Sequence, residues 1–354
     1  MVSSDRLEEH EPLPELIRSE DELEELLSMP SPKTTKVLSE LDGDVLVLGV
    51  SGKIGPTLAR LVKRAIDDGR LEKSVIGASR FSNPGLRGKL NEAGIETVSC
   101  DLMDEDAVEN LPDAQNVIYM VGRKFGTEED SSLTWGINTY LPALVSKKFR
   151  NSRITVFSTG NVYPLVPVSS GGADESTIPN PVGEYAQSCL GRERIFEYFS
   201  GRYGTKILFL RLNYAVELRY GVLLDVAQKV FHGSPVDLKM GYVNVIWQGD
   251  VNNIAVQSLK LCKSPPEIIN VTGPETVSVR WLSEQFGRLF DKKPVFKNRE
   301  METALLSNTS KCFRVFGRPT VMLEQMIKWV AHWVLIGGCT FNKPTHFEVV
   351  DGKF

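Results

Sequence analysis

The chain has 354 residues, of which 42% are hydrophobic and 24% are charged, and its net charge is −4. This length allows about two domains, and the acidic balance argues against nucleic acid or an anionic membrane as a partner. The five cysteines are scattered and the four histidines lack ligand spacing, so we expect neither a disulfide framework nor a metal site. No apolar leader or bilayer-long apolar run is present, which predicts a cytoplasmic protein.

Residues 1–42 are predicted to form an acidic helical extension. Residues 1–27 carry ten acidic side chains against two arginines, which leaves about +4 on the rest of the chain. Ser19 is the expected cap of a short helix that ends before Pro30 and Pro32. The extension is interpreted as a helix packed on the outside of the body, and the alternative is a lid or dimer clasp.

Strands and helices are expected to alternate from residue 44 onward. Short apolar strands are predicted over residues 45–50, 74–78, 96–100, 116–121, 154–158 and 206–212. Helices are predicted over 58–66, 135–148 and 184–203, and mixed elements follow at 223–231, 243–247, 252–262 and 267–271. This order predicts an α/β fold, with a doubly wound parallel sheet (Rossmann) over residues 43–213 and a smaller C-terminal α/β substrate lobe with a tail over 214–354.

A glycine-rich loop joins the first strand to the first helix. Gly49, Gly52 and Gly55 have the spacing that provides a tight turn, a close approach to a pyrophosphate and close helix–strand packing. Lys53 and Ile54 lie inside this loop, and the helix that follows directs its free N–H groups at the phosphates. The loop therefore predicts dinucleotide binding.

The end of the second strand bears on the choice of cofactor. NAD-binding proteins place an acidic residue there for the ribose 2′-hydroxyl, whereas this chain has Ser79 and Arg80. Arg80 can pair with a 2′-phosphate, so NADP is favoured over NAD. Asp101 and Leu102, after the third strand, are predicted to lie near the adenine.

The segment after the fifth strand carries a second motif. Ser158-Thr159 is followed by Val162-Tyr163, and Tyr185 comes twenty-six residues after Thr159. With the glycine loop, this pattern resembles the extended short-chain dehydrogenase/reductases, also called the NAD-dependent epimerase/dehydratase family, from about residue 44 to 271. The resemblance implies hydride transfer on a sugar or sugar acid, with Tyr185 as the acid/base and Thr159 polarising the substrate oxygen.

The resemblance also implies a set of binding residues and partners. Cofactor contacts are expected at Gly49, Gly52, Lys53, Ile54, Gly55, Ser79, Arg80, Asp101, Leu102, Val121, Asn138 and Tyr185. Substrate contacts are expected at Asn161, Asn213, Trp247 (as an aromatic platform, with a buried tryptophan as the alternative) and His346 (from a tail folded over the site, with an ordered surface tail as the alternative). A small carbohydrate-like substrate and a homodimer complete the expectation.

One position departs from the family pattern. The family has a lysine four residues after the tyrosine, and this chain has Cys189. A tyrosine titrates near about 10 in water, and a neutral thiol does not favour its phenolate as an ammonium does. Three hypotheses remain open: another cation substitutes (Arg192, Lys343 or Lys53), Tyr185 acts only as a proton donor, or the protein is a non-catalytic dinucleotide sensor or scaffold.

Overall fold

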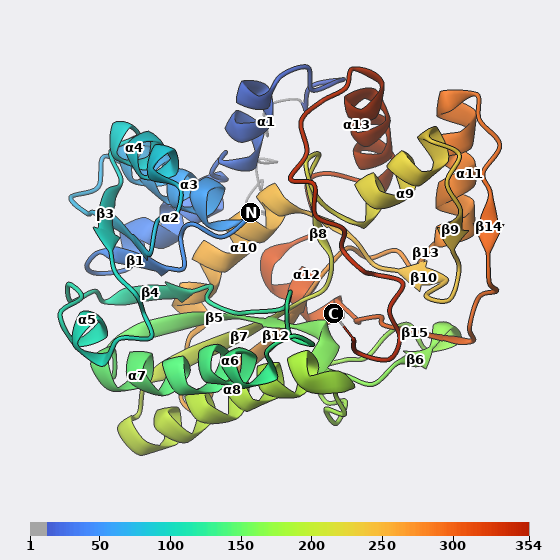
Figure 1. The fold of residues 1–354 in the computed structure, drawn as a ribbon. Helices are drawn as coiled ribbons and strands as arrows, with labels where there is room; N and C mark the ends of the chain where they lie inside the picture. Colours follow the sequence, from blue (N-terminus) through green and yellow to red (C-terminus); the bar gives the residue numbers. More distant parts are fainter. Residues whose placement is uncertain (1–12, 354) are drawn as a thin grey trace, which may run out of the picture.

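The computed structural model describes residues 13–353, and its centre is a seven-stranded parallel sheet (Figure 1). The strands are β1 (Val45–Leu48), β2 (Val75–Ser79), β3 (Glu96–Ser99), β4 (Asn116–Tyr119), β5 (Arg153–Thr159), β7 (Lys206–Leu212) and β12 (Glu267–Val271). Their order is β12-β7-β5-β4-β1-β2-β3, and every neighbouring pair is parallel. The predicted Rossmann fold is confirmed.

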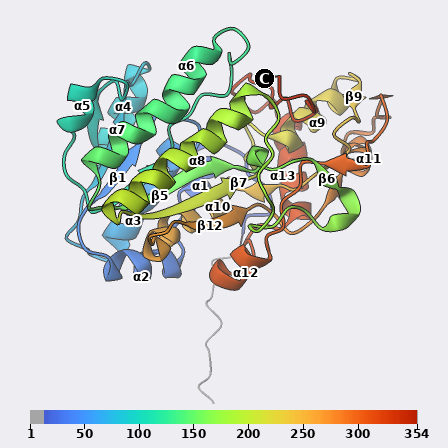
Figure 2. The ribbon, with the colours of Figure 1, turned by 90° about the horizontal axis from the view of Figure 1, so that it is seen from below.

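Helices cover both faces of the sheet because its strands are apolar on both faces. In β1, Val45 and Val47 belong to one core, and Leu46 and Leu48 belong to another. The first face is covered by α2 (Pro32–Glu40), α3 (Gly55–Asp68) and α10 (Gln248–Ser258). The second face is covered by α5 (Glu105–Glu109), α7 (Leu141–Lys148) and α8 (Gly183–Tyr203), and Figure 2 shows α7 and α8 crossing it.

The helix predicted over residues 135–148 is divided in the structure. A short α6 (Ser131–Trp135) passes into a π turn over Gly136–Tyr140 before α7 begins. Pro142 lies at the start of α7, and because it has no N–H it cannot continue the hydrogen-bond ladder of the preceding turn. The helix α4 (Pro84–Glu92) was not predicted, and only one of its residues, Leu90, is buried.

In its described part, residues 13–42, the N-terminal extension contains two helices instead of the one predicted. After α1 (Glu20–Leu27), the segment expected to end the helix begins α2: Ser31 caps it by accepting a hydrogen bond from Thr34 N, and Pro32 occupies its first turn. The extension packs on the body, where Asn253 on α10 accepts a hydrogen bond from Ser31 N at 2.8 Å. Residues 1–12 of the predicted extension, with four of the ten acidic side chains of residues 1–27, lie outside the described residues.

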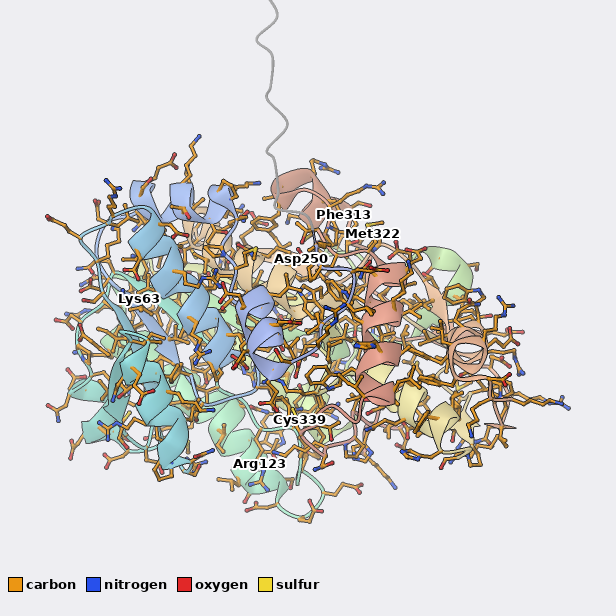
Figure 3. All side chains as sticks on the ribbon, turned by 90° about the horizontal axis from the view of Figure 1, so that it is seen from above. Lys63, Arg123, Asp250, Phe313, Met322 and Cys339 are labelled. Atoms are coloured by element: carbon orange, nitrogen blue, oxygen red, sulfur yellow. The ribbon has the colours of Figure 1, made fainter. Side chains whose placement is uncertain are left out.

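The C-terminal lobe has its own hydrophobic core around α9 (Val222–Phe231), α11 (Val279–Phe290) and α13 (Leu323–Leu335). Asp250 on α10 accepts hydrogen bonds from Thr320 N and Oγ1 at 3.0 and 2.6 Å, which fixes the loop leading into α13. Figure 3 labels Asp250 and Met322, the residue just before α13. The remaining elements are β6 (Val166–Pro167), β8 (Ala215–Val216), β9 (Val236–Asp237), β10 (Tyr242–Val243), β11 (Ile246–Trp247), β13 (Val277–Ser278), β14 (Phe296–Lys297), β15 (Thr303–Ala304) and α12 (Ser310–Phe316).

The two parts of the chain are not divided cleanly at residue 213. The seventh strand of the sheet, β12, and the covering helix α10 both come from beyond that boundary. Residues 243–247, predicted as one strand, form the two short strands β10 and β11, each paired with a different partner. The sequence after residue 213 therefore crosses between the sheet and the lobe more than once.

Candidate active site

The glycine loop has the geometry that a pyrophosphate needs. Gly49 has φ +84°, a left-handed conformation that favours glycine at the turn after β1. A Cβ on Gly55 would lie 2.3 Å from the Val50 carbonyl oxygen, so only glycine allows α3 to start this close to β1. Gly52 is exposed, and the first turn of α3 has no side-chain cap. The loop therefore leaves an open backbone and an uncapped helix N-terminus for an anion.

The predicted adenosine residues lie around the end of β2 and β3. Ser79 is buried and shares a hydrogen bond with the Ser51 hydroxyl of the glycine loop, whereas Arg80 is exposed. Asp101 is exposed and accepts a hydrogen bond from Met103 N at 3.0 Å, and Leu102 is buried. A groove of about 800 Å³ extends from Ser51, Gly52 and Lys53 along α3 and α4.

The Lys53 side chain, which also lines this groove, reaches toward the C-terminal lobe. Its Nζ lies 3.0 Å from the centroid of the Tyr220 ring and 4.9 Å from that of Phe125. Burial, together with the positive charges of Lys124 and Lys343, lowers the pKa of Lys53 to about 7. A phosphate at this loop would relieve that repulsion.

A smaller cavity of about 220 Å³ lies at the carboxyl edge of the sheet, next to the glycine loop. Thr159, the last residue of β5, and Tyr185, in the first turn of α8, both line it. The other lining residues are Ile54, Lys124, Ser158, Asn161, Leu212, Asn213, Tyr214, Ala215, Tyr220, Gly221, Val222 and Thr345. The structure thus brings the two proposed catalytic residues to one cavity with Ile54, Asn161 and Asn213.

The surroundings of Tyr185 act on its pKa in both directions. Burial raises the pKa of Tyr185 and the neighbouring Cys189 adds to this, while the charge of Arg192 and a hydrogen bond with Thr159 oppose it. The net direction is upward, so the phenol is favoured over the phenolate in the protein without ligand.

Cys189 occupies the place of a small buried side chain. It is 0% exposed and belongs to a hydrophobic cluster with Val162, Tyr163 and Ala173. Burial raises the pKa of its thiol, so Cys189 is neutral and offers no positive charge to Tyr185.

Arg192, one turn further along α8, is fixed beneath the cavity. Its Nη1 donates to the Phe157 carbonyl at 3.0 Å and its Nη2 donates to Asn138 Oδ1 at 2.6 Å. Asn138 in turn donates to Ser188 Oγ at 2.9 Å and to the Arg123 carbonyl at 3.1 Å. Asn138 is therefore fully buried and positions the loop after β4 against α8, and its side chain is not open to a cofactor.

Sequence reasoning missed Lys124. This half-buried side chain lies in the loop after β4, and its Nζ is 5.9 Å from the centroid of the Tyr185 ring. It donates to the Thr345 carbonyl at 3.1 Å. Its place after the fourth strand was the available signal, because ligands of such sheets bind outside the carboxyl ends of the strands. Val121, three residues earlier, is half-buried beside Gly49.

A charged network lies behind the cavity. Arg211 on β7 makes two hydrogen bonds with Glu193 on α8, at 3.0 and 2.6 Å, and both side chains are almost fully buried. Glu193 also accepts from Ser158 Oγ at 2.5 Å, and Arg211 donates to Tyr163 Oη at 2.8 Å. This network ties α8 to the ends of β5 and β7, and so fixes the helix that carries Tyr185.

The tail after α13 runs between the sheet and the lobe (Figure 1), and its residue Thr345 lines the cavity. Thr345 N donates to Asp225 on α9 at 2.8 Å, and the His346 ring lies 6.1 Å from that of Phe125. His346 is thus near the site but is not among the residues that line the cavity. Trp247 differs from the expected aromatic platform: it is 2% exposed and packs against Trp329 in the core of the lobe.

Two properties concern the described residues as a whole. Within residues 13–353, no group of three His, Cys, Asp or Glu side chains is arranged to hold a metal ion. None of the helices in that range has the length and apolar character needed to cross a membrane.

A protein-family model matches the chain over residues 45–216, and its description is the NAD dependent epimerase/dehydratase family. Residues 45–216 are thus similar to this family. The match covers the glycine loop, Thr159 and Tyr185, the residues that carry the resemblance to the extended short-chain dehydrogenase/reductases. A comparison with curated protein sequences finds no match.

Solved structures with the same fold include sugar-nucleotide epimerases. The UDP-glucose 4-epimerase of Thermotoga maritima, solved with UDP-glucose, matches with a TM-score of 0.70 at 19% identity, over 83% of this chain and 99% of the other. The UDP-glucose 4-epimerase of Thermus thermophilus, in complex with NAD, matches with a TM-score of 0.66 at 22% identity, over 82% and 98%. A UDP-glucuronic acid 4-epimerase of Bacillus cereus matches with a TM-score of 0.70 at 16% identity, over 83% and 99%.

Proposed function

We propose that this protein is an NAD(P)-dependent oxidoreductase or epimerase/dehydratase that acts on a sugar or sugar acid by hydride transfer. The observation that carries the proposal is the cavity at the carboxyl edge of the sheet, where Thr159 and Tyr185 meet beside the glycine loop. A nicotinamide dinucleotide on that loop would supply the hydride acceptor or donor. The chain's own residues would orient the substrate and move its proton.

In this proposal Tyr185 is the acid/base and Thr159 positions the substrate oxygen. Thr159 Oγ1 accepts hydrogen bonds from Asn161 N and Nδ2, both at 3.1 Å, and shares a further hydrogen bond with Tyr185, so the two side chains meet where a substrate oxygen would bind. Because burial raises the pKa of Tyr185, the residue is poised to donate a proton, which suits reduction of a carbonyl better than oxidation of an alcohol.

The cofactor is an NAD(H)-type dinucleotide, and we propose a preference for NADP. The exposed Arg80 and the Ser51–Ser79 pair lie at the end of β2, where an acidic side chain would otherwise hold the ribose 2′-hydroxyl. The similar Thermus thermophilus and Bacillus cereus structures hold NAD. The proposed preference for NADP therefore rests on this chain's own residues and not on those structures.

The cofactor preference is tested by titrating the purified protein with NADPH and NADH after any bound dinucleotide has been released and identified by mass spectrometry. We expect tighter NADPH binding, and we expect Arg80→Ala to weaken NADPH much more than NADH because only NADPH carries the 2′-phosphate. Arg87→Ala, on the exposed face of α4, is the control. A tightly retained NAD would contradict the preference.

For the substrate we propose a free sugar or sugar acid. The cavity of about 220 Å³ is small, and Thr345 of the tail closes one side of it. The related epimerases were solved with UDP-sugars, which makes a nucleotide sugar the alternative. A panel of aldoses, uronic acids and UDP-sugars, monitored by nicotinamide absorbance and product analysis, separates the two.

The role of Tyr185 is tested with Tyr185→Phe once a substrate is known. Removing a general acid/base costs about 10²–10⁴-fold in rate, so we expect turnover to fall at least about a hundredfold with little change in dinucleotide affinity. Tyr198→Phe, an exposed tyrosine on the same helix, is the matched control. Turnover that survives Tyr185→Phe would reject the assignment.

A second candidate function is a non-catalytic dinucleotide sensor, which Cys189 favours. Cys189→Lys would restore the family's lysine. A sensor would gain no turnover from it, whereas an enzyme would become faster or change its pH optimum. We further propose a homodimer in the cytoplasm, which sedimentation of the purified protein and fractionation of cells would test.

A further inference from the structure

Lys124 is the cationic side chain that shares the cavity with Tyr185. Of the described residues that line this cavity, Lys124 alone is a lysine or arginine. Its Nζ lies 5.9 Å from the Tyr185 ring centroid and 5.6 Å from that of Phe125. Opposite charges at such distances inside a protein favour the ionised form of the partner.

Lys124 is held in this place from two sides. The loop that carries it is fixed by Asn138, whose Oδ1 accepts from Arg123 N at 3.1 Å. Its ammonium donates to the Thr345 carbonyl of the tail at 3.1 Å. The tail segment is itself anchored, because Thr345 N and Oγ1 both donate to Asp225 at 2.8 and 2.5 Å.

The other candidate cations are less suited than Lys124 to act as the charge partner of the Tyr185 hydroxyl. Arg192 lowers the pKa of Tyr185 from below, but its Nη1 and Nη2 donate to protein acceptors and a guanidinium stays protonated. Lys53 lies against the Tyr220 ring, and Lys343 is exposed. Lys124 differs from Arg192 because burial lowers its pKa to about 8, where it can gain or lose a proton.

We propose that Lys124, reaching the cavity from the loop after β4, replaces the missing lysine of α8 as the charge partner of Tyr185. The inference rests on the proposed function, in which Tyr185 is the acid/base. With Lys124 protonated, its ammonium stabilises the Tyr185 phenolate. With Lys124 neutral, the phenol is favoured. The same charge is thus supplied from a different strand end.

Several other charged or titratable groups face this pair, and the test must separate them. They are Asp225 on α9, Glu348, Lys343 and His346 on the tail, Lys53 on the glycine loop, Cys189 and Arg192 on α8, and the cavity tyrosines Tyr214 and Tyr220. Since three tyrosines line one cavity, the signal of Tyr185 must be isolated by difference.

The experiment is a pH titration of tyrosinate absorbance in the full chain, with no substrate required. Each protein is measured beside the same protein carrying Tyr185→Phe, so that the difference reports Tyr185 alone. Because Lys124 is neutral at the alkaline pH where Tyr185 ionises, the sensitive comparison is between Lys124→Arg, which keeps its charge there, and Lys124→Met, which has none. We expect the Tyr185 midpoint to lie at least about one pH unit lower in Lys124→Arg than in Lys124→Met, a tenfold difference in its ionisation constant.

The control is Lys148→Met, which removes a lysine that pairs with Asp113 at 2.9 Å, before the opposite end of β4. It should leave the midpoint unchanged. Equal Tyr185 midpoints in Lys124→Arg and Lys124→Met, or a Tyr185 that stays protonated in Lys124→Arg until alkaline unfolding, overturn the inference. A midpoint that moves only in Arg192→Lys would assign the charge to Arg192 instead. Failure of the proposed function would appear separately, as turnover that survives Tyr185→Phe.

Discussion

Glu193 and Arg211 form a buried ion pair on which the position of α8 depends. Both residues are 2% exposed, so removal of one partner leaves an uncompensated charge in the core. We expect Glu193→Gln to lower the free energy of unfolding by about 3–5 kcal/mol. The control is Glu197→Gln, on the same helix, whose pair with Arg194 is about half exposed and should cost less than about 1 kcal/mol. Urea unfolding measures both, and equal losses would contradict the expectation.

At the residue scale, the sequence reveals side chains whose spacing reflects chemistry. The interval between Thr159 and Tyr185 and the pattern of the glycine loop predict residues that lie around one cavity or beside it. Lys124 and Trp247 show the limit. Nothing local tells that Lys124 points to Tyr185 or that Trp247 turns toward Trp329, since both depend on how distant segments pack.

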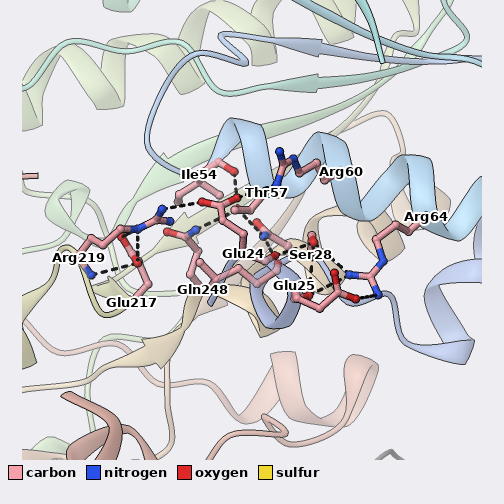
Figure 4. Close-up of polar contacts among 12 residues, drawn as sticks. Glu24, Glu25, Ser28, Ile54, Thr57, Arg60, Arg64, Glu217, Arg219 and Gln248 are labelled. Carbon is pink, nitrogen blue, oxygen red and sulfur yellow. Dashed lines mark hydrogen bonds and ion pairs between the residues drawn. The ribbon is translucent and has the colours of Figure 1, made fainter. Parts of the chain in front are cut away.

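At the element scale, ion pairs of the helix α1 connect α3 to the C-terminal lobe (Figure 4). The Glu24 carboxylate lies 3.3 Å from Arg60 on α3 and 2.6 Å from Arg219, which also pairs with the buried Glu217. These ion pairs span the groove that extends from the glycine loop, because Glu24, Arg60 and Arg219 all line that groove.

Loss of the Glu24 ion pairs should make local opening of α1 more frequent. We expect Glu24→Gln to raise amide hydrogen exchange in α1 and in the first turns of α3 by several-fold, because both arginines lose their shared partner. Glu25→Gln is the control: its pair with Arg64 involves a 63% exposed carboxylate and should matter little. Mass spectrometry of exchanging peptides reads out the difference. The same exchange in both variants would show that apolar packing alone holds α1.

Strands and helices with a regular apolar pattern could be predicted from the sequence. Elements interrupted by a proline could not. The strands of the sheet and α8 follow from apolar runs and periodicity, and their bounds agree with the prediction to within a few residues. The Pro30–Pro32 segment was interpreted only as a stop, although Ser31 and Pro32 are equally a start signal. The π turn before α7 depends on Pro142 and on Asn138 being held by other elements.

At the scale of the whole molecule, we expect the cluster of Lys53, Lys124 and Lys343 to couple cofactor binding to proton uptake, through Lys53 and Lys124. In the free protein the pKa of Lys53 is lowered to about 7 and that of Lys124 to about 8. A bound pyrophosphate should favour the ammonium forms and raise both pKa values. Binding should then take up protons between about pH 7 and 9, and dinucleotide affinity should fall as the pH rises through that range.

Calorimetric titration in two buffers of different ionisation enthalpy measures this proton uptake directly. Lys53→Met should bind more weakly and take up fewer protons. Lys148→Met, remote from the cluster, should behave as the wild type. Affinity independent of pH between 7 and 9 would contradict the coupling.

The predicted division of the chain at residue 213 describes two cores but not two independent segments. One core surrounds α9, α11 and α13, and the other lies under α2, α3 and α10. The apolar pattern of a strand such as β12 is the same whether the strand joins the main sheet or a lobe, because that local pattern carries no information on the neighbouring strand. Its pairing with β7 is a property of the whole fold.

The docking of the N-terminal extension has a consequence for the order of folding. Ser31 bonds Asn253, 222 residues away, and Trp329 Nε1 donates to the Pro14 carbonyl, 315 residues away. Contacts of such separation carry a large loop-closure entropy and form late. We therefore expect the N-terminal extension to be among the last segments to become ordered, after the sheet and the lobe have joined to form the surface on which it packs.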